Sequence, residues 1–202
     1  AGLSAEAAWK GEIARREAAT AEILGVIRSS PTSVQQTFET IAAAATRLCG
    51  ADLAGLYQFD GTLIHFVAQH GRTPEEIDAA RRAFPQPPNR TTSTGRAILS
   101  GDVVQVKDAS GDPDMAAPLR VFRTVLSVPM IHDARPIGAI TVARREVQPF
   151  TEKQIALLQT FADQAVIAIE NVRLFTELKA SSRDLSDALD RQTVTADILR
   201  TI

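Results

Sequence analysis

The sequence of 202 residues is 45% apolar and 23% charged, which is enough for one domain of ordinary size with a sizeable core. Its formal net charge of −2 provides no basic surface for nucleic acid or an anionic membrane, so we expect neither as a partner. No signal-peptide pattern opens the sequence, and no run of the ~18 apolar residues that a membrane span needs is present, so we expect no membrane segment. The single cysteine, Cys49, excludes an intrachain disulfide and thiolate metal clusters. These features favour a reducing, cytoplasmic location.

An amphipathic helix is predicted within residues 1–29. The stretch Ser4–Ser29 contains no proline, and its apolar positions recur at helical spacing, among them Trp9, Ile13 and Leu24. Pro31 ends this helix. A capping-box pattern at 32–35 begins a second helix, which we expect to run to Leu48.

The middle of the chain changes to strand-like segments. The expected strands are Leu53–Phe59, Thr62–His70, Val103–Lys107, Val125–Met130 and Ile137–Ala143. Asp60-Gly61, between the first two strands, is a hairpin signal. The last two strands are apolar at nearly every position, so both of their faces should be covered.

Two short helices are predicted among the strands. One begins at the capping-box pattern of Thr73 and runs to about Ala83, and the other lies around Thr94–Leu99. The segment Phe84–Arg90 contains three prolines and is predicted to be a loop, as is Ala109–Pro113.

A very long helix is predicted to begin at the capping-box pattern of Thr151, because no glycine or proline follows before Asp190. Such a helix would be ~60 Å long. Its apolar seam comprises Leu158, Phe161, Ala165, Ala168, Val172 and Phe175, and after one irregular step Leu178, Ser182, Leu185 and Leu189. The irregular step from Phe175 to Leu178 is a stammer. We expect the first half of the seam to pack on the sheet and the second half to pair with another copy, as in a parallel dimer.

The end of the chain repeats its beginning. RQTVTADILRTI at Arg191–Ile202 matches REAATAEILGVI at Arg16–Ile27 in six of twelve positions. The offset is domain-sized and too long for a solenoid repeat of about 20–50 residues. We therefore expect the chain to be one part of a larger array of modules.

The stretch FRTVLSVPMIHDARPIGAITVARREVQPFTEKQIALLQTFADQAVIAIENVRLFTEL (Phe122–Leu178) resembles the C-terminal half of a GAF domain, of the kind found in tandem arrays of bacterial multidomain (hybrid) sensor histidine kinases. RLCGAD, LYQFDG and TGRAILSGDVVQVKDASGDPDM fit the earlier half, and RQTVTADILR is similar to the linker phrases between such modules. The resemblance implies an α+β fold with a central antiparallel sheet of five or six strands and helices on one face. It also implies a ligand cavity on the other face, and long flanking signalling helices.

We expect no enzyme and no metal site. His65 and His70 fall on opposite faces of their strand and His132 is remote, and no catalytic or phosphate-binding motif is present. Within the resemblance, the signatures for cyclic nucleotides and bilin are missing, and methionine-sulfoxide reductases need several cysteines. We therefore expect no cofactor and assign Cys49 to the core. We expect His65 and His70 to be ordinary hydrogen-bonded histidines, and haem ligation by either is the less favoured alternative.

A generic ligand pocket remains. Its candidate lining residues are Tyr57, Phe59, His65 and Phe66 on the hairpin, Arg96 on the short helix, and Asp108 and Arg123 near strand ends. A second interpretation pairs Arg96, Asp108 and Arg123 with one another as ion pairs that fix the loops. Both interpretations stand at this stage.

The predicted organisation is a signalling helix over 1–29, a GAF domain over 30–172 and a coiled-coil linker over 173–202 that runs into a next module. The predicted function is a non-catalytic sensory or relay module of a two-component signalling protein, with a sensor histidine kinase as its parent. It would dimerise through the terminal helices and pass a ligand- or neighbour-induced change along them. The alternatives are a structural dimerisation spacer without ligand, or the input domain of a transcriptional activator or nucleotide cyclase.

Overall fold

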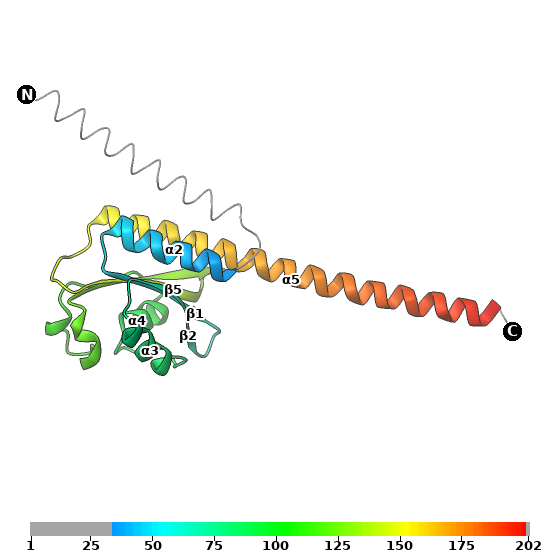
Figure 1. Cartoon of the computed structure of the whole chain (residues 1–202), viewed down its shortest axis with the longest axis horizontal. Helices are drawn as coiled ribbons and strands as arrows, with labels where there is room; N and C mark the ends of the chain where they lie inside the picture. Colours follow the sequence, from blue (N-terminus) through cyan, green and yellow to red (C-terminus); the bar gives the residue numbers. More distant parts are fainter. Residues whose placement is uncertain (1–33, 201–202) are drawn as a thin grey trace, which may run out of the picture. The chain divides into compact units, whose positions relative to one another are not determined.

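Five antiparallel strands form one sheet in the order β2-β1-β5-β4-β3 (Figure 1). The strands are β1 Leu53–Phe59, β2 Ile64–His70, β3 Val104–Val106, β4 Thr124–His132 and β5 Arg135–Arg144. The computed structural model describes residues 34–200, and the side chains of all of these except 118, 120, 176 and 184–200. The predicted α+β class with an antiparallel sheet is confirmed. The helix predicted within 1–29, with Trp9, Ile13 and Leu24, lies outside the described residues.

Helices cover both faces of this sheet. They are α2 Val34–Cys49, α3 Pro74–Ala83, α4 Ser93–Ser100 and α5 Glu152–Arg200, with short 3₁₀ turns η1 Ala109–Gly111 and η2 Ala117–Val121. The chain divides into two units, of which the first ends at Ala168 and the second contains the rest of α5. Within the first unit, α2 and the start of α5 lie side by side on one face, and α3 and α4 lie on the other (Figure 1). The predicted short helices are therefore present on the face where the resemblance places a cavity.

The two faces of the sheet carry side chains of different size. The face under α2 and α5 bears large buried residues, namely Leu56, Leu126, Val128, Ile140 and Val142. Because successive residues of a strand point to opposite faces, their neighbours face α3 and α4, and many of these are small: Gly55, Ser127, Ala139, Thr141 and Ala143. The large side chains fill a core against the long helices, whereas the small ones leave space on the other side.

A buried arginine joins the end of α2 to the segment that precedes α5. Arg144, at the end of β5, is only 5% exposed. Its Nε donates to the carbonyl oxygen of Gly50 at 2.9 Å, its Nη2 to that of Cys49 at 2.7 Å and its Nη1 to that of Gln148 at 2.6 Å. The guanidinium also lies 4.1 Å from the ring centroid of Phe150. These carbonyls include groups that the C-terminus of α2 leaves without helical partners, and a cation is favoured there.

The start of α5 is capped as predicted. The backbone N–H of Gln154 donates to Thr151 Oγ1 at 3.3 Å, and the backbone N–H of Thr151 donates to Gln154 Oε1 at 3.0 Å. Gln154 Nε2 donates in addition to the carbonyl oxygen of Cys49 at 2.7 Å. The capping residue of α5 therefore contacts the end of α2 as well.

The hairpin turn between β1 and β2 is longer than the sequence pattern indicated. Asp60 Oδ1 accepts hydrogen bonds from the backbone N–H groups of Thr62 and Leu63, both at 2.8 Å. These bonds hold both residues in the turn, so β2 begins at Ile64 and the predicted start at Thr62 is wrong.

The turn between β4 and β5 contains only Asp133 and Ala134, with φ angles of 47° and 60°. A two-residue hairpin turn with both φ angles positive matches the twist of the flanking strands. The tight turn lets β4 and β5 pair up to His132 and Arg135, so both strands extend beyond their predicted ends.

We expect the substitution Ala134→Gly to stabilise the protein by about 0.5–1 kcal/mol, because glycine adopts a positive φ without a Cβ clash. Urea unfolding measures the change. The control Ala156→Gly, at an exposed position of α5, should instead destabilise by about 0.5–1 kcal/mol. Loss of stability at both positions would contradict the described turn.

We expect Arg144→Met to lower the free energy of unfolding by roughly 2–5 kcal/mol, because it leaves several buried carbonyl groups without donors. Arg47→Met, at an exposed position in the last turn of α2, is the matched control and should change it by less than about 0.5 kcal/mol. Equal effects of the two substitutions in urea unfolding would show that the buried contacts of Arg144 do not stabilise the fold.

Candidate functional site

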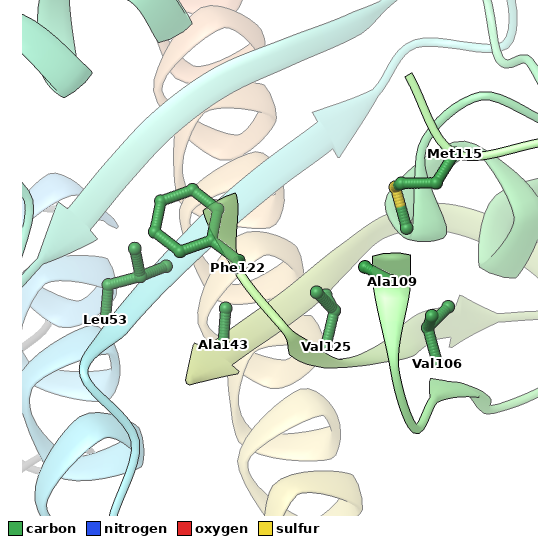
Figure 2. Packing of buried hydrophobic residues seen from close by; sticks show 7 residues of the cluster. All are labelled: Leu53, Val106, Ala109, Met115, Phe122, Val125 and Ala143. Atoms are coloured by element: carbon green, nitrogen blue, oxygen red, sulfur yellow. The ribbon is translucent and has the colours of Figure 1, made fainter. Parts of the chain in front are cut away.

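A cavity of about 280 Å³ lies on the small-residue face of the sheet. The strands contribute Leu53, Tyr57, Val125, Thr141 and Ala143 to its lining. Loops and short helices contribute Phe84, Gln86, Met115, Leu119 and Phe122, together with Thr91–Thr94 at the start of α4. Figure 2 shows Leu53, Val125 and Ala143 on the strands, with Phe122 and Met115 in the same apolar cluster. The lining is mostly apolar, which is typical of small-molecule sites.

Aromatic side chains form a cluster beside the cavity, and two of them, Tyr57 and Phe84, line it. The ring centroid of Tyr57 lies 5.0 Å from that of Phe84 and 5.5 Å from that of Phe66, both in tilted arrangements. Phe59 packs against the same cluster. Such contacts add stability beyond the burial of apolar area. They hold the proline-rich loop that carries Phe84 against the first hairpin.

The same loop approaches α4 closely at Gly95. A Cβ atom on this residue would lie 2.2 Å from the carbonyl oxygen of Asn89, so only glycine fits. The Thr92 hydroxyl caps α4 by accepting a hydrogen bond from the backbone N–H of Gly95 at 2.9 Å. The TGRA motif therefore brings the first turn of α4 and the loop together at the cavity.

An ion pair connects α4 to the loop that contains Asp112 and Met115. Arg96 donates to the two carboxylate oxygens of Asp112 at 2.6 and 2.9 Å, and this bidentate contact lowers the pKa of Asp112. Asp112 also accepts from the backbone N–H of Met115 at 3.1 Å. Arg96 thus does not line the cavity but fixes the loop that carries the lining residue Met115.

Asp108 and Arg123 form a second bidentate pair. Arg123 Nε and Nη2 donate to the Asp108 carboxylate, both at 3.0 Å, and this contact holds the pKa of Asp108 well below its ordinary value. The pair connects η1 to the start of β4, next to the lining residue Phe122. The loop-fixing interpretation therefore describes the contacts of both residues, and ligand contact by either stays a prediction.

Among the remaining candidates, Tyr57 lines the cavity, whereas Phe59 and Phe66 pack beside it. His65 lies at the hairpin turn, with its Nε2 atom 2.7 Å from Asp60 Oδ2. Hydrogen bonds from the backbone of Leu63 and from His65 lower the pKa of Asp60 to about 2. His65 is therefore held away from the cavity.

Sequence reasoning missed two polar features of the cavity, namely Arg72 and a chain of buried hydroxyls of which Ser93, Thr94 and Thr141 line it. Ser127 Oγ donates to Ser93 Oγ at 2.9 Å and lies 2.7 Å from Thr141 Oγ1, which lies 2.8 Å from Thr94 Oγ1. Ser127 and Thr141 alternate with apolar residues on central strands, which is the one signal that marks a polar spot on this face. Arg72 lies two residues after the end of β2 and had no such signal.

Neither His65 nor His70 is among the lining residues of the cavity. Within residues 34–200, no group of three or more histidine, cysteine or acidic side chains is placed to hold a metal ion. No helix among the described residues is long and apolar enough to cross a membrane.

The predicted seam of α5 begins inside the domain. Leu158, Phe161 and Ala165 are fully buried, as we expected for the half of the seam that packs on the sheet. Because these three side chains already pack within their own domain, they are not accessible to a second copy. Ala168 is half-buried.

The later part of the seam is exposed where its side chains are described. Phe175 and Leu178 are 55% and 67% exposed, whereas Val172 is half-buried. Leu185 and Leu189 lie beyond residue 183, where the side chains are not described. The exposed apolar residues of this part of α5 are the candidates for contact with a second copy.

Residues 31–170 match the GAF domain family. No curated protein shows significant similarity to the chain. Among solved structures, the GAF domain of the phosphoenolpyruvate-protein phosphotransferase from Acinetobacter is similar, with 17% identity and a TM-score of 0.68 over 81% of this chain and 98% of that one.

Two other similar structures come from proteins of different activity. The free methionine-R-sulfoxide reductase from Neisseria meningitidis, in complex with its substrate, has 21% identity and a TM-score of 0.65 over 77% of this chain and 88% of that one. A domain assigned to a two-component sensor histidine kinase of Sinorhizobium meliloti 1021 has 17% identity and a TM-score of 0.58 over 73% and 98%. At these identities the likeness establishes the fold alone.

We expect Cys49 to be unreactive in the folded protein. Burial raises the pKa of its thiol from 9.0 to about 11, and because a thiol reacts as its thiolate, alkylation by iodoacetamide at pH 8 should be roughly 100-fold slower than in the unfolded chain. Mass spectrometry of timed samples, with and without guanidinium, measures both rates. Equal rates would contradict the described position of Cys49.

Proposed function

Because the chain belongs to the GAF domain family, we propose that it is a non-catalytic sensory or relay module of a cytosolic signal-transduction protein. In this proposal, occupancy of the cavity or a change in a neighbouring module biases two packings of paired terminal helices. A ligand shifts such an equilibrium only by its differential affinity for the two states.

The observation that carries the proposal is the open, mostly apolar cavity of about 280 Å³. A spacer without ligand would be expected to fill this space with side chains. Instead, small residues on the central strands leave it open, and two bidentate ion pairs hold the surrounding loops. This arrangement favours a ligand-binding module over the spacer alternative.

A route from the cavity to the helices runs through the sheet itself. On β5, Thr141 and Ala143 line the cavity, whereas Ile140 and Val142 belong to the core on the face of α2 and the start of α5. A ligand that displaces β5 would therefore act on both layers at once, since a close-packed core transmits small displacements. In this proposal, β5 itself connects the cavity to the helices, and no further structural element is needed for the transmission.

Reductase chemistry is not favoured by the position of the thiol. The one cysteine of the sequence, Cys49, lies at the end of α2, and its Sγ is 3.8 Å from the carbonyl oxygen of Gln154 in α5. It does not line the cavity. The similar reductase structure therefore supports a small-molecule site here and not a thiol reaction, which is why we propose a non-catalytic module.

The proposed parent is a sensor histidine kinase. Two observations support it: the repeated phrase RQTVTADILR, which is similar to linkers in such arrays, and the similar fold of a domain assigned to a two-component histidine kinase. The input domain of a transcriptional activator or nucleotide cyclase is the alternative, and the sequence beyond this module decides between them.

We propose that dimerisation uses the exposed apolar residues of α5. Leu174, Phe175 and Leu178 are each more than half exposed. Apolar side chains on one side of a helix gain stability when a second helix covers them. The stammer between Phe175 and Leu178 would locally overwind the pair, which gives a two-state linker a place to change its packing.

The full chain should be a dimer at micromolar concentration in analytical ultracentrifugation, and a chain ending at Asn171 should be a monomer. The double substitution Phe175→Asp and Leu178→Asp should weaken dimerisation by roughly 100-fold or more, because each dimer loses four apolar side chains, two from each copy. Ser181→Asp, at an exposed polar position of α5, is the matched control and should leave the dimer intact. If the full chain itself sediments as a monomer, the paired-helix mechanism fails.

A further inference from the structure

A single charged side chain lies among the cavity residues. Arg72 lines the cavity, and its Nη2 donates to the Tyr57 hydroxyl at 3.1 Å. The guanidinium carbon lies 5.6 Å from the ring centroid of Phe66 and 6.0 Å from that of Phe122. The cation is therefore surrounded by aromatic rings, an environment in which each electrostatic contact is stronger than in water.

No described side chain neutralises this charge. Arg72 Nε is buried and has no hydrogen-bond partner among the described residues. Glu76 attracts Arg72 only at longer range, because its carboxylate is held by Arg145 Nη2 at 2.7 Å and by the backbone N–H of Thr73 at 3.0 Å. A partly buried cation without a carboxylate partner is costly unless an anion is supplied from outside.

The buried hydroxyl chain offers a second donor. Since Ser127 donates its single proton to Ser93, the bond between Ser127 and Thr141 must be donated by Thr141, and the next one by Thr94. Ser93 is thus the last acceptor of the chain, and its own proton has no acceptor among the described residues. Ser93 is 4% exposed and lines the cavity. Each bond in such a chain polarises the next, so the terminal O–H is a good donor.

A third donor is the Tyr57 hydroxyl. Because it accepts from Arg72, its own proton remains for another acceptor. Arg72, Tyr57 and Ser93 therefore present hydrogen-bond donors to the same cavity. Among the described lining residues no aspartate or glutamate is present. A cavity of this composition favours a ligand rich in acceptor atoms with one negative charge.

We propose that the cavity binds a small monocarboxylic acid with an apolar tail, whose carboxylate pairs with the Arg72 guanidinium and accepts from hydroxyls that line the same cavity. The proposal rests on the ligand-binding role above and names its chemistry. The planar guanidinium matches a carboxylate in a two-bond contact. The aliphatic and aromatic lining, with Leu53, Val125 and Phe122, receives the tail.

Charge and size select this class over others. A phosphate monoester carries up to two negative charges, and the described lining offers one cation, so the second charge would stay uncompensated. The cavity of about 280 Å³ is slightly smaller than the ~300–1,000 Å³ of drug-sized sites, which favours a small acid over nucleotides and other large anions. A neutral ligand would leave Arg72 without a counter-charge.

The test uses isothermal titration calorimetry of the full chain with two carboxylates, hexanoate and phenylacetate. Phenylacetamide is the neutral comparison, and phenyl phosphate is the comparison with up to two negative charges. At least one carboxylate should bind with a stoichiometry of one per chain and about 10-fold or more tighter than phenylacetamide or phenyl phosphate. Arg72→Met should weaken carboxylate binding by about 10–100-fold and leave binding of the amide nearly unchanged.

Arg82→Met, at an exposed position of α3, changes the net charge equally and should not affect binding. If Arg72→Met does not fold, as judged by circular dichroism, Ser93→Ala takes its place and should weaken carboxylate binding by roughly 5–10-fold. Absence of carboxylate binding at millimolar concentration, or equal affinity for the amide, would overturn the proposal.

The outcomes separate this inference from the proposed function. If native mass spectrometry of the purified protein shows a bound neutral molecule that Arg72→Met does not displace, the anion chemistry is wrong and the ligand-binding module stands. If the carboxylate binds and the full chain is nevertheless monomeric, the helix relay is wrong and the carboxylate site stands.

Discussion

The buried guanidinium of Arg144 is the constraint on which the layered structure depends. It is held by backbone carbonyls from the end of α2 and from the segment before α5, at distances down to 2.6 Å, and by the ring of Phe150. Because carbonyl dipoles and not a carboxylate surround it, the charge is satisfied only when both segments are in place. The strand end, the helix end and the next helix start are thereby fixed together, and the large-residue face of the sheet is closed.

The opposite face of the sheet is not closed by packing but keeps an open cavity. Small residues on the central strands cannot fill the layer, and the loops above them are held at a distance by the Arg96–Asp112 and Asp108–Arg123 pairs. Space remains because these pairs support the loops at their edges and not over the cavity. Similar folds at 17–21% identity share the architecture. In our proposal, the donors that line the cavity of this chain, Arg72, Tyr57 and Ser93, decide what it binds.

For the candidate site, sequence reasoning located the region and left open whether its charged residues contact a ligand or pair as ion pairs that fix the loops. Tyr57 and the TGRA motif were found from their places on the hairpin and the short helix, and both lie at the cavity. The charged residues Arg96, Asp108 and Arg123 instead form pairs beside it. Polarity at a strand or helix end does not reveal whether a side chain points to a ligand or to another loop. Arg72 was missed because a lone arginine after a strand reads as a solvated surface residue.

What the sequence determined by itself was the order and type of the elements, since periodicity, capping boxes and turn residues are local signals. The capped starts at Thr73 and Thr151 and the strands followed from these signals, whereas the α+β class followed from the resemblance to GAF domains. Only the tertiary structure decided which neighbours Arg144 and Arg72 have, because one is surrounded by carbonyls and the other by aromatic rings from segments distant in sequence. Arg144 therefore holds structural segments together, whereas Arg72 binds a ligand in our proposal. This difference arises from packing, which no local sequence pattern encodes.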